Sequence, residues 1–173
     1  MLQNTYSDII RDQTDRALWE IRNVIACLPD DLWEKPYCEA PLWQHIYHML
    51  HSLDQWYINP NDASYTEPAF HAAELNNLDV RPQIVLSREQ LYDYGEAVCG
   101  KIKSYTAALT DEVLLEKPEG CKFTRFTLIM GQFRHLHSHM GMLMGFLIAE
   151  TGEWPYVVGL TRDIPEGEFG ILC

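Results

Sequence analysis

Six of the seven histidines in this chain of 173 residues stand in two short groups. The first group is His45, His48 and His51, and the second is His135, His137 and His139. Neutral imidazole nitrogens are ligands for zinc, nickel, iron and copper. The two groups therefore predict a site for a divalent metal ion, provided that the fold brings them together.

The spacing of the second group separates its members. On a helix, His135 and His139 lie about 40° apart on one face, and His137 lies on the opposite side. The face that carries the pair also carries mostly apolar or small residues, namely Leu128, Gly131, Gln132, Met142, Leu143 and Phe146. We expect His135 and His139 in the middle of an inward-facing stripe, and His137 on the surface.

Two imidazoles that point into a core must have their ring nitrogens satisfied. A divalent metal satisfies one nitrogen of each ring. The alternative is a hydrogen bond from each ring to a buried Tyr or Asp. Two histidines one helical turn apart, with another histidine group elsewhere in the chain, favour the metal.

Several known metal motifs do not match this pattern. The HExxH motif of metalloproteases needs Glu where this chain has Leu136. Di-iron bundles need Glu three residues before the histidine, where this chain has Gln132. The zinc deaminase motif is absent from the sequence as well.

A catalytic metal site usually has three protein ligands and an open position. No two members of the first group are four residues apart, so we expect one ligand from it. The apolar stripe of that segment centres on Ile46, and all three histidines lie off its centre. The spacing leaves open whether His45, His48 or His51 is the ligand, and any of them could instead lie at the surface or its boundary.

Four segments have the periodicity of amphipathic helices. They run from about Gln3 to Leu28, Leu42 to Ile58, Ser87 to Leu109 and Thr124 to Glu150. Pro29 ends the first helix and Pro60 follows the second. Ser87 and Gln90 form a capping-box pattern, and Gly152 suits the left-handed position after the last helix.

The connection between the second and third helices, residues 59–86, is the longest. A linker of that length in a compact domain is a functional loop or a crossover. The pattern predicts an all-α fold, a four-helix bundle with one long crossover between helices two and three. We expect a single domain over residues 1–173, with an irregular tail from about residue 152.

The composition is that of a globular protein, with 47% apolar and 22% charged residues. The formal net charge of −12 argues against nucleic acid as a partner. We see no signal peptide, and the longest nearly apolar stretch, Met140–Ala149, is too short to span a membrane. The five cysteines have no zinc-ribbon spacing and suggest reduced thiols. We therefore expect a cytoplasmic protein without a membrane partner.

Two segments resemble the DinB-like superfamily of metal-binding four-helix bundles. Residues 43–56 (WQHIYHMLHSLDQW) are similar to the stretch of its second helix with the pattern YHxL…DxW, and residues 135–141 (HLHSHMG) to its fourth-helix pattern HxxxHxG. The resemblance implies that His48, His135 and His139 hold the metal. It also implies an up-down-down-up order of the helices.

The resemblance further implies a metal-dependent enzyme, because similar proteins include thiol-dependent S-transferases and a maleylpyruvate isomerase. We expect a divalent metal, zinc or nickel first and iron or copper next, that activates a small-molecule thiol or water. The substrate would be a small molecule such as a low-molecular-weight thiol. The alternative is a non-catalytic bundle with a structural or incidental metal, acting in stress response or as an interaction module.

Three further residues could support this site. Gln132, Tyr47 and Asp54 are candidates to contact the ligands, and Asp54 could orient a ligand histidine through its ring N–H. The alternative for Asp54, which we favour, is a solvated helix residue. Cys99 is expected to be a buried, inert thiol. Gly141 and Gly145 allow close helix packing, and a homodimer is one use of such a surface.

Overall fold

The computed structural model describes residues 5–173; Gln3, the predicted start of the first helix, lies outside them. The helices are α1 (Tyr6–Cys27), α2 (Leu42–Trp56), α3 (Arg88–Ala107), α4 (Asp111–Leu114) and α5 (Arg125–Thr151). A 3-10 turn (Asp30–Leu32) and a hairpin of β1 (Pro36–Tyr37) and β2 (Ala40–Pro41) join α1 to α2. The predicted all-α class is confirmed.

The ends of the long helices follow the predicted capping residues. The Ser87 side chain accepts a hydrogen bond from the Gln90 main chain, and the Gln90 side chain accepts one from the Ser87 main chain. Thr124 caps the start of α5 in a similar way. Gly152 ends α5 with a φ of 77°, in the left-handed region where Gly carries no penalty.

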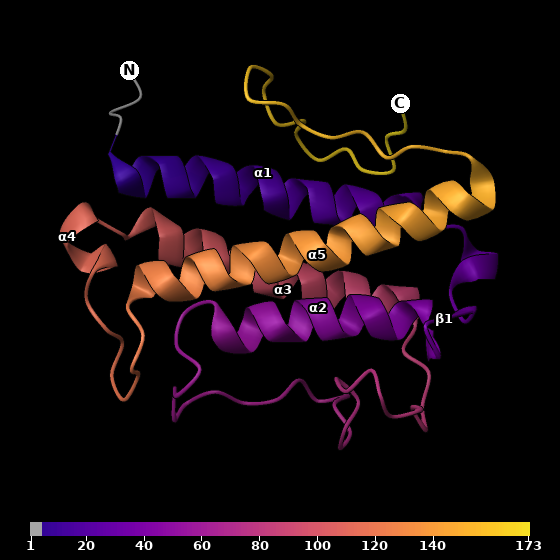
Figure 1. Ribbon diagram of the computed structural model, residues 1–173, viewed down its shortest axis with the longest axis horizontal. Helices are drawn as coiled ribbons and strands as arrows, with labels where there is room; N and C mark the ends of the chain where they lie inside the picture. The colour runs from indigo at the N-terminus through magenta and orange to yellow at the C-terminus, as the bar shows by residue number, and fades with distance from the viewer. Residues whose placement is uncertain (1–4) are drawn as a thin grey trace.

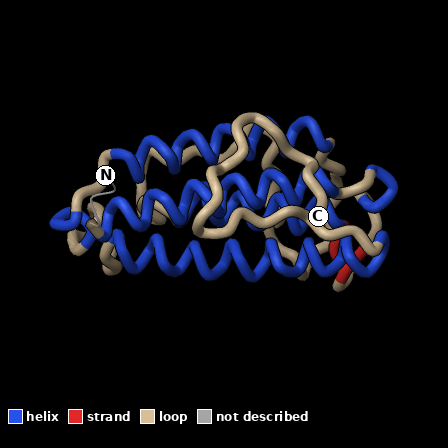
Figure 2. Tube along the Cα trace, turned by 90° about the horizontal axis from the view of Figure 1, so that it is seen from above, coloured by secondary structure: helices blue, strands red, loops and turns tan. Residues whose placement is uncertain are grey.

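Four long helices lie side by side (Figure 1). α5 packs against α1 and α2, and α3 packs against the same two helices from the other side. In Figure 1, α1 and α5 run in one direction and α2 and α3 in the other. The view from above shows the same helices nearly parallel, with the tail lying across them (Figure 2).

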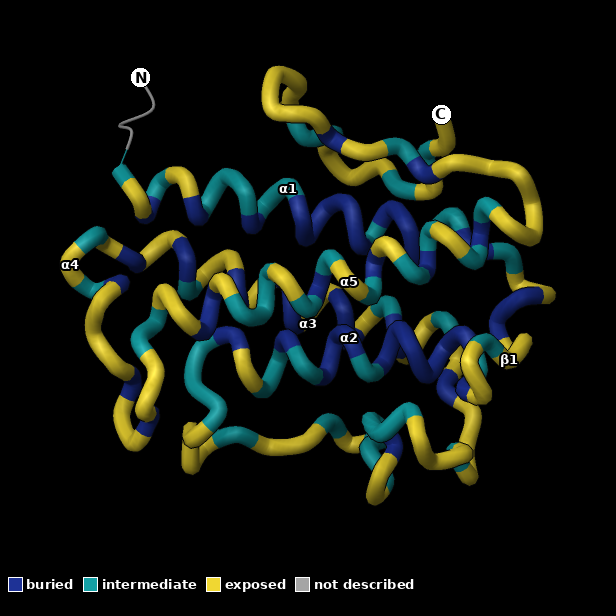
Figure 3. Tube along the Cα trace, viewed as in Figure 1, coloured by how far each residue is buried: buried dark blue, intermediate teal, exposed yellow. Residues whose placement is uncertain are grey.

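The core lies between these helices, where their inward faces meet (Figure 3). Each long helix contributes a side chain with no solvent exposure, including Ile21, Ile46, Leu91 and Leu143. α2 is the most deeply buried of the four, since ten of its fifteen residues are buried. Side chains that project from α2 are therefore held by packing on several sides.

The buried face of α5 differs from the prediction. Its buried residues are Leu128, Ile129, Leu136, Met140, Leu143 and Leu147, whereas His135 and His139 are half-buried. At 100° per residue, the centre of this face lies about 60° from His139 and about 100° from His135. Because α5 packs between α1 and α2, its core face points between them, and the histidine pair lies on the flank toward α2.

His137 lies on the opposite flank, away from the pair, as the helical spacing predicted. It is half-buried and not fully exposed, because its ring packs on Phe133 with 4.2 Å between the ring centroids. Its Nδ1–H donates to the Phe133 main-chain oxygen at 2.7 Å, a local bond within one turn of α5.

The amphipathic stripe predicted for the first helix includes Tyr6 and Ile9, but these two side chains are 72% and 51% exposed. They line an apolar groove with Phe126 and Met130 of α5 instead of entering the core. None of the helices within residues 5–173 combines the length and apolarity needed to cross a bilayer.

The long connection between α2 and α3 follows α2 along its outer side, below α2 in Figure 1. The Gln44 amide donates to the main-chain oxygens of Leu75, Asn77 and Val80. Leu75 and Leu86 are almost completely buried. These anchors keep the segment against α2, although it has no helix or strand of its own.

Candidate metal centre

Three imidazoles from two helices converge at the contact between α2 and α5. The Nε2 atom of His135 lies 3.2 Å from Nε2 of His48 and 3.1 Å from Nε2 of His139. One ligand atom from each of these rings falls within 4.8 Å of the others. The structure therefore brings together the three residues that the family resemblance implied.

His48 is held in one orientation by the long connection. Its Nδ1–H donates to the main-chain oxygen of Asn76 at 2.7 Å. A carbonyl oxygen only accepts, so the ring proton is on Nδ1 and the Nε2 lone pair points at His135. Metal-binding histidines are commonly fixed by a carbonyl or carboxylate in this manner.

The spacing of the three Nε2 atoms fits a shared ion. Bonds of 2.0–2.1 Å to a tetrahedral zinc place the ligand nitrogens about 3.3 Å apart. Direct hydrogen bonds fit less well, because His48 presents a lone pair and a single N–H on His135 would have to serve two contacts. A divalent cation accepts all three lone pairs.

The remaining ring nitrogens of the α5 pair lack the kind of partner that His48 has. Among the described residues, the Nδ1 atoms of His135 and His139 are buried without a hydrogen-bond partner. An ion at Nε2 places the ring proton on Nδ1, so the orientation of these two rings comes from packing and not from a hydrogen-bond acceptor. The donor set of three neutral imidazoles suits zinc, nickel, iron and copper.

Electrostatics keep two of these rings neutral. Burial, and after it the neighbouring His135, His48 and His45, lower the pKa of His139 to about 4. The pKa of His135 is also lowered, first by burial and then by His48. A metal ligand must be deprotonated, so at neutral pH both rings are in the form that binds.

The other two histidines of the first group are occupied elsewhere. His45 and His51 are only 2% and 3% exposed, so the surface or boundary position considered for them is wrong. His45 Nε2–H donates to the Tyr37 main-chain oxygen at 2.7 Å. His51 Nε2–H donates to a carboxylate oxygen of Glu67 at 2.7 Å. In this structure His48 alone of the group faces the α5 pair.

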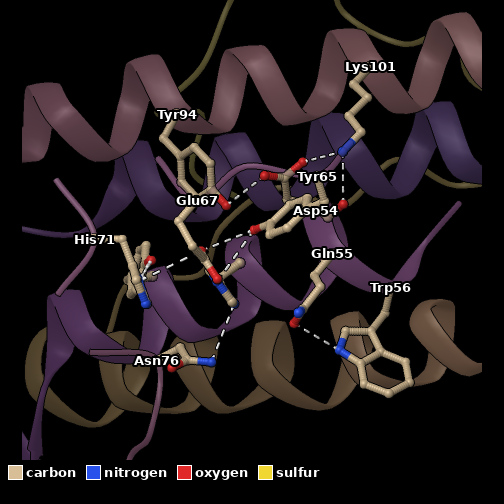
Figure 4. A network of polar contacts seen from close by, with 11 residues as sticks. Asp54, Gln55, Trp56, Tyr65, Glu67, His71, Asn76, Tyr94 and Lys101 are labelled. Carbon is tan, nitrogen blue, oxygen red and sulfur yellow. Dashed lines mark hydrogen bonds and ion pairs between the residues drawn. The ribbon is translucent and has the colours of Figure 1, made fainter. Parts of the chain in front are cut away.

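The residues proposed to support the ligands have different roles. Asp54 accepts hydrogen bonds from Tyr94 and Lys101 (Figure 4), so the idea that it orients a ligand histidine is wrong. Gln132 accepts a bond from Ser52, which joins α5 to α2 beside the site. The supporting acceptor for His48 is a main-chain oxygen, which no residue type could have revealed.

Tyr47 and Cys99 are both buried. The Tyr47 hydroxyl is hydrogen-bonded to His71 Nδ1 at 2.6 Å. Burial raises the pKa of Cys99 to about 11, so the thiol stays protonated and inert, as predicted.

A second polar cluster lies beside the first and was missed by the sequence reasoning. It joins His51 of α2 to Glu67 and His71 of the long connection, with Tyr65 and Asn76 around them (Figure 4). His71 is the seventh histidine, isolated in a segment without periodicity. The length of that segment was the one signal that pointed to it.

No protein-family model, curated protein or solved structure matches the chain.

Proposed function

We propose that this chain is a metal-binding protein of the DinB-like type, with a four-helix bundle in up-down-down-up order. The directions of the four long helices in Figure 1 support the proposal. The long connection lies between the second and third of these helices, as that order requires. The histidine spacing on α2 and α5 adds the chemical part of the resemblance.

The site holds one divalent ion, zinc or nickel in the first place, on His48, His135 and His139. The observation that carries this assignment is the convergence of three Nε2 atoms at 3.1 and 3.2 Å, with His48 oriented by Asn76. All three histidines are half-buried, so the cluster lies at the edge of the core.

We infer a metal-dependent reaction in which the ion activates a small-molecule thiol, as in an S-transferase, or water, as in a hydrolase. Three neutral ligands leave the full charge of the ion in place, which lowers the pKa of a bound thiol or water. The chain's own residues hold and orient the ion. The main-chain oxygen of Asn76 fixes the orientation of His48. The chain as a whole is acidic, with 13 positive and 25 negative side chains.

The test compares metal retention in matched variants. His135→Ala and His139→Ala should each lower zinc affinity by at least about 100-fold, because each removes a ligand. His137→Ala, from the same helix, is the control and should bind like wild type. Equal retention in His135→Ala and His137→Ala would show that the site is elsewhere.

Turnover is tested separately on the metal-loaded protein, with a panel of low-molecular-weight thiols plus electrophiles and a panel of esters. Activity that is lost in His139→Ala and kept in His137→Ala would support an enzymatic function at this metal site. Zinc-dependent thermal stabilisation without turnover on either panel would favour a structural metal.

A further inference from the structure

We propose that His51, Glu67 and His71 form a second divalent-metal site, which clips the long connection between α2 and α3 onto α2. The two imidazoles and one carboxylate come from different parts of the chain and meet at one point. The proposal is independent of the first site, with which it shares no ligand.

The three side chains converge closely enough for one ion. His51 Nε2 lies 2.7 Å and His71 Nδ1 lies 3.8 Å from the same Glu67 oxygen, Oε2. A tetrahedral zinc would place such ligand atoms about 3.3 Å apart, so each distance differs by about half an ångström, in opposite directions. The two rings are already stacked, with centroids 5.3 Å apart and planes at 16°.

The donor set is one that zinc uses. Two histidines and one glutamate hold catalytic zinc in known hydrolases, and two histidines with a carboxylate also suit iron. The Tyr65 hydroxyl donates to the same Glu67 oxygen at 3.2 Å and lies 3.5 Å from His51 Nε2. A phenol oxygen therefore lies beside two of the three proposed ligand atoms.

The ring protons can adjust to an ion. Without one, His51 carries its proton on Nε2, and the Asn76 amide donates to Nδ1 at 3.4 Å. An ion at Nε2 moves that proton to Nδ1, where the Asn76 amide accepts it by turning its oxygen to the ring. At His71, the ion takes the place of the Tyr47 hydroxyl as partner of Nδ1.

The proposed ion would stabilise the fold because it joins a buried residue of α2 to an exposed residue of the long connection. His51 is 3% exposed and belongs to α2, whereas Glu67 is exposed and belongs to a segment with no secondary structure. An ion between them crosslinks a loosely structured segment to a rigid helix, and its binding free energy then opposes local opening. Asn76 contacts both His48 and His51, so the crosslink also steadies the acceptor that orients His48.

The first test counts ions. Chelator-stripped full-length chain is titrated with Zn²⁺ alone, and bound zinc is measured after gel filtration. The variant Glu67→Gln/His71→Ala should hold one ion fewer than wild type, and His135→Ala/His139→Ala should lose a different one. Glu74→Gln, an exposed residue of the same segment, is the control and should match wild type.

The second test measures the clip itself. Zinc at a hundred times its Kd should slow proteolysis within residues 59–86 by roughly 100-fold in wild type and not in Glu67→Gln/His71→Ala. Circular dichroism checks that the variant is folded. Equal zinc content in that variant and wild type, or a cleavage rate that zinc does not change, would overturn the second site. If only His135→Ala/His139→Ala loses zinc, the second site is overturned and the first site is supported.

Discussion

The two nitrogens of the His48 ring have different partners. Nδ1 is tied to the main chain of Asn76, and Nε2 faces the α5 pair. The tautomer is thus fixed by the fold before any ion binds. This preorganisation limits the conformational freedom that the ring must lose on binding.

The tautomer gives a direct prediction. In the metal-free protein at pH 7.5, His48 should carry its proton on Nδ1, because the Asn76 oxygen can only accept. Long-range ¹H–¹⁵N spectra distinguish the two tautomers of each ring. A proton on Nε2 of His48 would contradict the geometry on which the metal centre rests.

Glu20 of α1 predicts a pH dependence of stability. Burial raises the pKa of this carboxyl, although the Val158 N–H donates to it at 2.9 Å. The folded state then binds the proton more tightly than the unfolded state, so the stability from this group is present at low pH. It is lost as pH rises through the raised pKa.

We therefore expect Glu20→Gln to be more stable than wild type at pH 7, with the difference shrinking toward pH 4. Urea unfolding across this range measures it. Glu153→Gln, exposed in the tail, should follow wild type at every pH. A Glu20→Gln protein that loses stability as pH rises, relative to wild type, would reverse the assigned sign.

At the scale of residues, the sequence predicted the contacts between side chains that are close together on one helix. The pairing of His135 with His139 follows from one helical turn, and the structure places both rings together. The choice of His48 over His45 and His51 depends on a main-chain oxygen 28 residues away and on a helix 87 residues away. Only the family resemblance, not the spacing, singled it out.

At the scale of elements, the start of α3 carries a further prediction. Ser87 closes the long connection and caps the helix, in a reciprocal box with Gln90. Ser87→Ala should lower the free energy of unfolding by about 1 kcal/mol. Ser104→Ala, an exposed change inside the same helix, should have almost no effect; equal losses would show that the cap is unimportant.

The helices were predictable because caps, prolines and periodicity act over a few residues. The short hairpin Pro36–Pro41 and the single turn of α4 gave no periodic signal and were missed. The inward face of α5 was assigned incorrectly for another reason. Apolar residues occur on most sides of α5, so their spacing does not single out one face. Which of them are buried depends on the packing of α5 against α1 and α2.

At the scale of the whole molecule, the tail is joined to the helices through Asn23. Its buried side chain donates to the main-chain oxygens of Tyr156 and Ile171 and accepts from the Ile171 N–H. The tail folds back on itself there, through a bridge between Pro155 and Leu172. One residue of α1 thus binds the tail near both of its ends, at Tyr156 and Ile171.

Asn23→Ala should destabilise the protein by about 1–3 kcal/mol, because it leaves buried main-chain groups without partners. Thermal or urea unfolding measures the loss, and faster hydrogen exchange in the tail should accompany it. Asn61→Ala also removes an amide-to-carbonyl bond, but an exposed one, and should have a much smaller effect. Similar losses for the two variants would mean that burial is not the cause.

The arrangement of the helices explains why the two histidine clusters lie together. α2 is central to both, since it meets α5 on one side and the long connection on the other. The positions of the four long helices along the chain followed from the sequence. The contacts between α2 and its neighbours did not, because they join residues far apart in the chain.

His48, His135 and His139 are proposed to bind one ion through imidazole nitrogen. X-ray absorption on the zinc-loaded Glu67→Gln/His71→Ala variant isolates this site. We expect a shell with three imidazoles and Zn–N distances of about 2.0–2.1 Å. A zinc shell with fewer than three imidazoles, or a variant that retains no zinc, would contradict it.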